Sequence, residues 1–192
     1  LEFEPGTKVQ YSDLGMILLG EIMRRASGRP LDQFVAQNLF TPLGMKSTFY
    51  RPDKSFLDRI APTENDPWRK RIVRGEVHDE NAFAMGGVAG HAGLFSTTHD
   101  LAVFAQMLLN GGIYDHRRYF SVETIHRFTA LQSGDRALGW GKPSESDWTG
   151  KVLSPQAYKH TGFTGTSIWI DPQKQLFVIL LTNRVHPTRE NT

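Results

Sequence analysis

The 192-residue sequence contains no cysteine, which excludes disulfide bonds, a thiolate nucleophile and zinc bound by cysteine. It also lacks an apolar run near the roughly 18 residues that a membrane-spanning helix requires, although 39% of its residues are hydrophobic. A charge surplus is missing as well, because 22 Lys and Arg balance 20 Asp and Glu to a formal +2. So small a charge gives no reason to expect a nucleic-acid partner. The composition therefore predicts a globular protein that does not bind nucleic acid.

Glycine and proline, by contrast, are plentiful. The 18 Gly and 10 Pro predict many turns and shaped loops and disfavour a plain helical bundle. Internal repeats and low-complexity tracts are absent from the sequence. The length suits one domain over residues 1–192, with its functional groups carried by loops.

Capping residues and proline mark four helix starts ahead of apolar positions at helical spacing. The first helix extends to about Ala26, and the third begins with the spacing of a capping box. The four starts lie at Ser12-Asp13, Pro30, Thr97-Asp100 and Ser121. Helices and loops thus fill about residues 1–135.

The end of the sequence has the pattern of strands. Residues 166–170 alternate in polarity, Asp171-Pro172 favours a turn, and residues 176–181 form a continuous apolar run. We expect a β-hairpin here, within an antiparallel strand region of about residues 136–192. Helices followed by antiparallel strands predict the α+β fold class.

Residues 51–93 show no sustained period of either kind. A stretch of this length without regular structure is usually functional or disordered. It ends in residues 85–93, where Gly and Ala surround His91, and such small residues require a close approach of backbone to backbone or to a ligand. We expect this segment to serve a function.

Tyr11-Ser12-Asp13 places a phenol just before a predicted helix N-terminus. The unpaired amides and the dipole of that terminus favour negative charge, and so favour Tyr11 as a base. A capped helix with a packed tyrosine is the simpler interpretation of this tripeptide taken alone.

His160-Thr161-Gly162 stands at the start of a predicted strand, and another glycine follows at Gly165. Polar groups and bare backbone along such an edge can hold a substrate through strand-like hydrogen bonds. The alternative is a glycine-rich strand end with an incidental histidine.

Together these segments resemble the penicillin-recognising serine hydrolases, the family of class C β-lactamases, DD-peptidases and related esterases and amidases. The order and spacing of motifs along nearly the whole chain carry the resemblance. The matching segments are residues 3–8 with Tyr11-Ser12-Asp13, 18–20, 28–31, 42–45, 93–97 with Asp100-Leu101, His160-Thr161-Gly162, and 168–172 followed by 176–181. The resemblance implies a β-lactamase/transpeptidase-like fold.

The resemblance also implies roles for individual residues. Tyr11 takes the place of the catalytic tyrosine, and His160 takes the place of the third-motif lysine. The family's serine attacks an amide or ester carbonyl to form an acyl-enzyme, without a metal or cofactor. The implied substrate-binding residues are Asp13, Thr161, Gly162, Thr164, Gly165 and Thr166, with a backbone N–H between Thr164 and Ser167 forming half of an oxyanion hole.

The sequence departs from the family pattern in several places. No lysine has a serine three positions before it, so the Ser-x-x-Lys nucleophile motif is absent. That motif precedes the tyrosine motif in the family, so truncation at both ends is the simplest account, and the chain alone is expected to be inactive. The remainder of the same domain is then an expected partner. Asp13 stands where Asn is usual and His160 where β-lactamases carry Lys, which disfavours β-lactam hydrolysis.

Residues 75–82 and 86–93 resemble a narrower branch that acts on muropeptides. This predicts a peptide or small-molecule substrate from the cell wall, and favours a periplasmic or secreted protein. Two other interpretations stay open. His78, Asp79 and His91 offer a metal-ligand set, although their spacing fits no zinc signature. A non-catalytic binding or regulatory module would have kept the fold and lost the nucleophile.

Overall fold

A computed structural model describes residues 2–144 and 149–191. Contacts divide the chain into two units, each assembled from segments that are distant in the sequence. The first unit comprises residues 1–12, 105–160 and 168–178, and the second comprises residues 13–104, 161–167 and 179–192. The single domain over residues 1–192 stays a prediction. Across the described ranges, no helix is long and apolar enough to cross a membrane.

The second unit begins with helix α1 (Asp13–Ser27), which starts where the sequence predicts. Gly28 follows it with a φ of 67°, the left-handed conformation that ends many helices. Helix α2 (Leu31–Val35) begins after Pro30 and continues as a π-helix over Ala36–Phe40. The second predicted helix is therefore confirmed, with a change of hydrogen-bond pattern halfway along.

The long segment without a sequence period consists of short elements. Strand β1 (Phe49–Tyr50) pairs antiparallel with β4 (Leu94–Phe95), and β2 (Asn65–Asp66) pairs antiparallel with β3 (Arg71–Ile72). A 3₁₀ helix spans Lys54–Arg59, and helix α3 spans Glu80–Ala84. Elements of two to six residues are too short to impose a recognisable period on the sequence.

The glycine run of residues 85–93 brings backbone against backbone. A Cβ added to Gly90 would lie 2.0 Å from the carbonyl oxygen of Met16 in α1. One added to Gly93 would lie 2.6 Å from the carbonyl oxygen of Gly87. The predicted close approach is confirmed, and its partner at Gly90 is the backbone of helix α1.

Helix α4 (Thr98–Leu109) begins at the predicted capping residue. The Thr97 hydroxyl accepts a hydrogen bond from the Asp100 N–H at 3.3 Å. The Asp100 carboxylate, however, accepts from the Ser47 N–H and the Thr48 hydroxyl, both at 2.8 Å. The Thr97 half of the predicted capping box is therefore confirmed. The Asp100 half is wrong, because its carboxylate binds residues 47–48.

The first unit contains the remaining helices and a small core. Strands β5 (Ile113–Tyr114) and β6 (Arg117–Arg118) pair antiparallel, and α6 spans Thr149–Val152. Helix α5 (Val122–Thr129) is capped by Ser121 as predicted, since the Ser121 side chain accepts from the Thr124 N–H. The buried core of this unit is formed by Ala105, Tyr158 and Ile170, with Trp140 and Phe177 packed against it.

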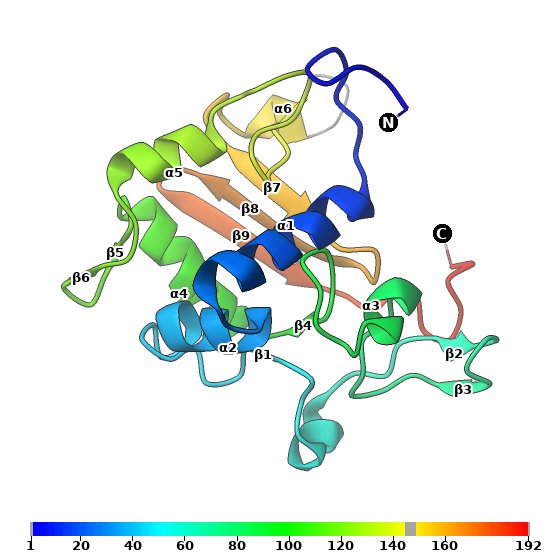
Figure 1. The fold of residues 1–192 in the computed structure, drawn as a ribbon. Helices are drawn as coiled ribbons and strands as arrows, with labels where there is room; N and C mark the ends of the chain where they lie inside the picture. The colour runs from blue at the N-terminus through cyan, green and yellow to red at the C-terminus, as the bar shows by residue number, and fades with distance from the viewer. Residues whose placement is uncertain (1, 145–148, 192) are drawn as a thin grey trace. The chain divides into compact units, whose positions relative to one another are not determined.

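The predicted hairpin is confirmed as strands β8 (Thr166–Asp171) and β9 (Leu176–Leu181). Strand β7 (Tyr158–Thr161) completes a three-stranded sheet in which β8 lies between β7 and β9 (Figure 1). At the hairpin turn, the Asp171 carboxylate accepts from the Ser154 N–H at 2.8 Å and the Ser154 hydroxyl at 2.6 Å. Burial raises the pKa of Asp171, but these donors outweigh it and leave the pKa lowered.

Candidate active site

Tyr11 lies in the first unit, two residues before the start of α1. Its side chain is 66% exposed. The guanidinium of Arg136 lies over the phenol ring, 5.1 Å from the ring centroid. A guanidinium in this position is attracted by the quadrupole of the ring face. Arg136 was not among the candidates from the sequence.

His160 also belongs to the first unit and is exposed near the end of β7. In the described part of the chain, no hydrogen bond or ion pair links His160 to Tyr11. The structure therefore places both predicted catalytic side chains in one unit and open to solvent, without direct pairing between them.

The turn after β7 belongs to the second unit and contains the predicted substrate edge. The Gly162 N–H donates to the Thr166 carbonyl at 2.7 Å, and the Gly165 N–H donates to the Gly162 carbonyl at 3.0 Å. These two amides are therefore occupied by the turn itself. Thr161 and Gly162 are exposed, whereas Thr164, Gly165 and Thr166 are half-buried.

Two other amides in this turn remain without an acceptor. Within residues 2–144 and 149–191, the N–H groups of Phe163 and Thr164 donate to no protein oxygen. Adjacent free N–H groups on one short turn are suited to stabilise a developing oxyanion. Thr164 lies in the range that the sequence indicated for such a donor, whereas Phe163 was missed as a site residue.

Gly165 allows the turn to lie close to residues 182–184. Its φ of +104° lies in the region that favours glycine, and a Cβ there would lie 2.6 Å from the Thr182 hydroxyl. The Thr182 N–H donates to the Gly165 carbonyl at 3.2 Å, and the Arg184 N–H donates to the Thr164 carbonyl at 3.1 Å. Residues 182–184 thus hold one side of the turn.

Asp13 is exposed at the first position of α1 and lies near two residues of the long loop. One side-chain ligand atom from each of Asp13, Asp79 and His91 lies within 4.8 Å of the others. Asp79 Oδ1 already accepts from the Ala82 N–H at 2.7 Å and faces His91 Nε2 at 2.8 Å. Burial raises the pKa of Asp79, but these partners outweigh it and lower the pKa overall. Helix capping and the Asp79–His91 pair account for this geometry, and we assign no metal to it.

The alternative metal-ligand set of His78, Asp79 and His91 does not come together in the structure. His78 is engaged by Glu64, with 2.9 Å between Nε2 and Oε2, and it is not part of the group around His91. Asp13 stands in its place.

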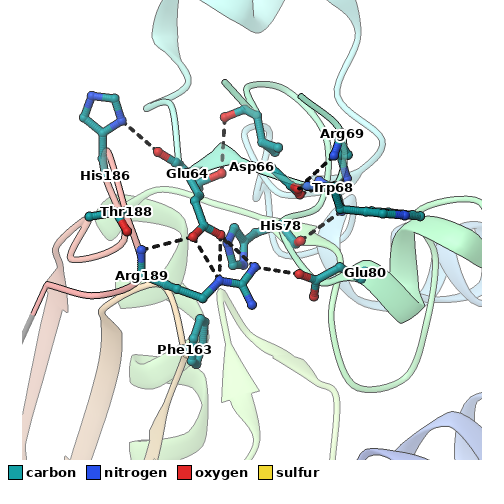
Figure 2. Close-up of polar contacts among 12 residues, drawn as sticks. Glu64, Asp66, Trp68, Arg69, His78, Glu80, Phe163, His186, Thr188 and Arg189 are labelled. Carbon is teal, nitrogen blue, oxygen red and sulfur yellow. Dashed lines mark hydrogen bonds and ion pairs between the residues drawn. The ribbon is translucent and has the colours of Figure 1, made fainter. Parts of the chain in front are cut away.

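His78 instead belongs to a polar cluster, which we define as Glu64, His78, Glu80 and Arg189 (Figure 2). Glu64 and His78 are buried, whereas Glu80 and Arg189 are partly exposed. The Glu64 side chain is only 3% exposed. It accepts from Arg189 Nε at 2.8 Å and from the Arg189 backbone N–H at 3.1 Å. Arg189 Nη2 also reaches Glu80 at 2.6 Å. The Arg189 guanidinium, followed by the His78 ring, lowers the pKa of Glu64 to about 2 despite burial.

Sequence reasoning missed Glu64 and Arg189, which are 125 residues apart. No local pattern signals a pair at such a separation. The nearby Arg69 is also not a free surface charge. The Arg69 side chain is buried and donates to the carbonyls of Val77 and His78, both at 3.0 Å.

Comparison with known proteins gives a match between all of residues 1–192 and the family model described as Beta-lactamase. The chain belongs to the beta-lactamase family. A protein of Escherichia coli O157:H7 that is named "Putative D-alanyl-D-alanine carboxypeptidase" is 42% identical over 205 residues. That match covers 97% of the chain and 47% of the relative, so the chain spans about half the length of the curated relatives it matches.

Solved structures of the beta-lactamase family and its neighbours share the fold. A Beta-Lactamase/D-Alanine Carboxypeptidase from Pseudomonas syringae superposes with a TM-score of 0.71 at 22% identity, covering 98% of this chain and 58% of that one. A beta-lactamase from Mycobacterium bovis gives a TM-score of 0.67 at 25% identity, covering 95% and 59%. The predicted β-lactamase/transpeptidase-like α+β fold is thereby confirmed.

Proposed function

We propose that the chain is part of a serine acyl hydrolase that cleaves an amide or ester through an acyl-enzyme. The observation that supports this most directly is the family match over residues 1–192, with Tyr11 before α1 and the His160-Thr161-Gly162 motif leading into a turn with two free amides. The attacking serine belongs to a Ser-x-x-Lys segment, which these 192 residues do not contain.

In this proposal each residue has a distinct task. Tyr11 accepts the proton of the attacking serine and returns it to the leaving group. The N–H of Phe163 or Thr164 donates to the oxyanion, together with the N–H of the serine itself. Thr161, Gly162, Gly165 and Thr166 shape the edge that the substrate lies against. His160 contacts the substrate in place of the lysine of the β-lactamases, because an imidazole can donate or accept a hydrogen bond.

The substrate that we propose is a cell-wall peptide. The relatives named as carboxypeptidases of D-alanyl-D-alanine support this class, as does the resemblance of residues 75–82 and 86–93 to the muropeptide branch. The exposed carboxylate of Asp13 suits a substrate amine better than a carbonyl oxygen, because a carboxylate only accepts hydrogen bonds. The periplasm or the cell exterior is the corresponding location.

The test is the intact mass of the natural protein before and after exposure to a serine-reactive fluorophosphonate. We expect one adduct, on a serine outside these 192 residues. Tyr11→Phe should slow labelling about 100-fold, the usual scale for loss of a general base. Tyr119→Phe is the matched control, because Tyr119 also has a guanidinium over its ring, that of Arg117 at 5.0 Å. A natural mass of 21.7 kDa without an adduct would contradict the proposal and favour a binding module.

A further inference from the structure

Phe163 has an unusual environment for a large apolar side chain. It follows the His160-Thr161-Gly162 motif, and its side chain is 57% exposed. Burial in a hydrophobic core therefore does not fix its orientation, and its place must be set by specific neighbours.

Those neighbours are one imidazole and two guanidinium groups, all in the second unit. The His78 ring stacks on Phe163 with 5.7 Å between ring centroids and 21° between ring planes. Arg184 lies 4.7 Å and Arg189 lies 5.9 Å from the centroid of the Phe163 ring. Cations over an aromatic face are attracted by its quadrupole, and stacking selects one ring orientation. Arg184 Nε also donates to the Phe163 carbonyl at 2.9 Å, which fixes the backbone at the same residue.

Glu64 fixes two of these three neighbours at once. Its carboxylate engages His78 Nε2 at 2.9 Å and Arg189 Nε at 2.8 Å (Figure 2). The bond from His78 Nε2 sets the direction of the imidazole ring, whose face is then presented to Phe163. Arg189 is further restrained by Glu80, so its guanidinium has little freedom to turn away.

We infer that the cluster of Glu64, His78, Glu80 and Arg189 positions the Phe163 turn so that the free N–H groups of Phe163 and Thr164 keep one direction. The inference rests on the proposed function, in which these amides receive the oxyanion. Donors aimed in advance at a developing charge are worth far more than donors that must reorganise. Phe163 and Glu64 are therefore positioning residues, and the long loop of residues 51–93 supplies the rigid support.

The test measures phosphonylation of the natural full-length protein by the fluorophosphonate, which loses fluoride to the attacking serine, in Phe163→Leu, Phe163→Tyr and Glu64→Gln variants. Phe163→Leu should lower the limiting phosphonylation rate about 10-fold, with the half-saturating probe concentration changed less than about 2-fold. Phe163→Tyr keeps the stacking ring and should restore the rate. Because Phe163 is 57% exposed, its replacement should leave the melting temperature nearly unchanged. Phe128→Leu is the control, since Phe128 is 48% exposed on α5, outside the cluster.

A second readout does not depend on catalysis. In protein labelled with 4-fluorophenylalanine, the ¹⁹F resonance that Phe163→Tyr removes belongs to Phe163. Glu64→Gln should move this resonance towards that of the free amino acid, because the stack on His78 loosens.

The outcomes separate the two proposals. If the wild-type protein is phosphonylated and Phe163→Leu reacts as fast, the inference is overturned and the proposed function stands. If the wild-type protein is not phosphonylated, the proposed function fails, and the ¹⁹F shift decides whether the cluster holds the turn. A Phe163 resonance unchanged by Glu64→Gln would overturn the positioning role in either case.

Discussion

The buried carboxylate of Glu64 contacts the side chains of both His78 and Arg189. Its carboxylate is 3% exposed and stays ionised because Arg189 and His78 surround it, which lowers its pKa from 4.5 to about 2. Removing one partner from a buried pair leaves an uncompensated charge, which is far costlier than losing an exposed ion pair.

This pKa gives a prediction for stability against pH. A carboxyl whose folded-state pKa is depressed contributes stability above its unfolded-state pKa, and this contribution is lost as pH falls through the folded-state pKa. For Glu64 the loss spans the interval from pH 4.5 to about 2. We expect Glu64→Gln to lower the free energy of unfolding by about 3 kcal/mol at pH 7 and by much less near pH 2.5. Urea unfolding at both pH values measures the difference, and an equal difference at both would contradict the assignment.

At the scale of residues, the sequence proposed site positions that carry a local signal. Tyr11 stands just before the start of α1, and His160 stands in a strand followed by glycine. Phe163 was passed over because an exposed aromatic in a turn has no distinctive pattern. Glu64 and Arg189 form their contact only in three dimensions, so no spacing rule could have found them.

At the scale of elements, the glycine run of residues 85–93 packs tightly against the backbone of helix α1. A Cβ at Gly90 would lie 2.0 Å from the Met16 carbonyl oxygen, which no real Cβ tolerates. We expect Gly90→Ala to destabilise the protein by about 3 kcal/mol, since helix backbone and loop must move apart. Gly15→Ala on the same helix is the control, because nothing lies within 4 Å of its Cβ, and it should stabilise by about 0.5 to 1 kcal/mol. Thermal unfolding of both variants measures these changes in stability. An unchanged stability of Gly90→Ala would contradict the close contact with Met16.

The elements themselves were predictable to different degrees. Helices α4 and α5 start at the capping side chains of Thr97 and Ser121, which are local signals. Helix α1 likewise starts at the predicted position. Strands of two residues such as β2 and β3 pair across a loop without any apolar alternation, so the sequence could not mark them. The misjudged role of Asp100 has the same cause, because its partners Ser47 and Thr48 are distant in the sequence.

At the scale of the whole molecule, the chain carries a large amount of apolar surface. In β9 the alternate side chains Leu176, Val178 and Leu180 are 44%, 47% and 51% exposed. Helix α1 exposes Leu14 by 76% and Leu18 by 60%. Contiguous apolar side chains on a terminal strand of a sheet favour pairing with another chain.

We therefore expect the 192-residue chain to self-associate at micromolar concentration. The double variant Val178→Lys and Leu180→Lys should shift it towards monomer, because two ammonium groups on one strand oppose edge-to-edge pairing. A control with lysine at the exposed polar positions Gln33 and His126 adds the same groups elsewhere. Sedimentation velocity distinguishes the cases: association through β9 requires that only the first variant dissociates. Equal dissociation in both would assign the effect to net charge, and a monomeric wild-type chain would show that these apolar side chains do not drive association.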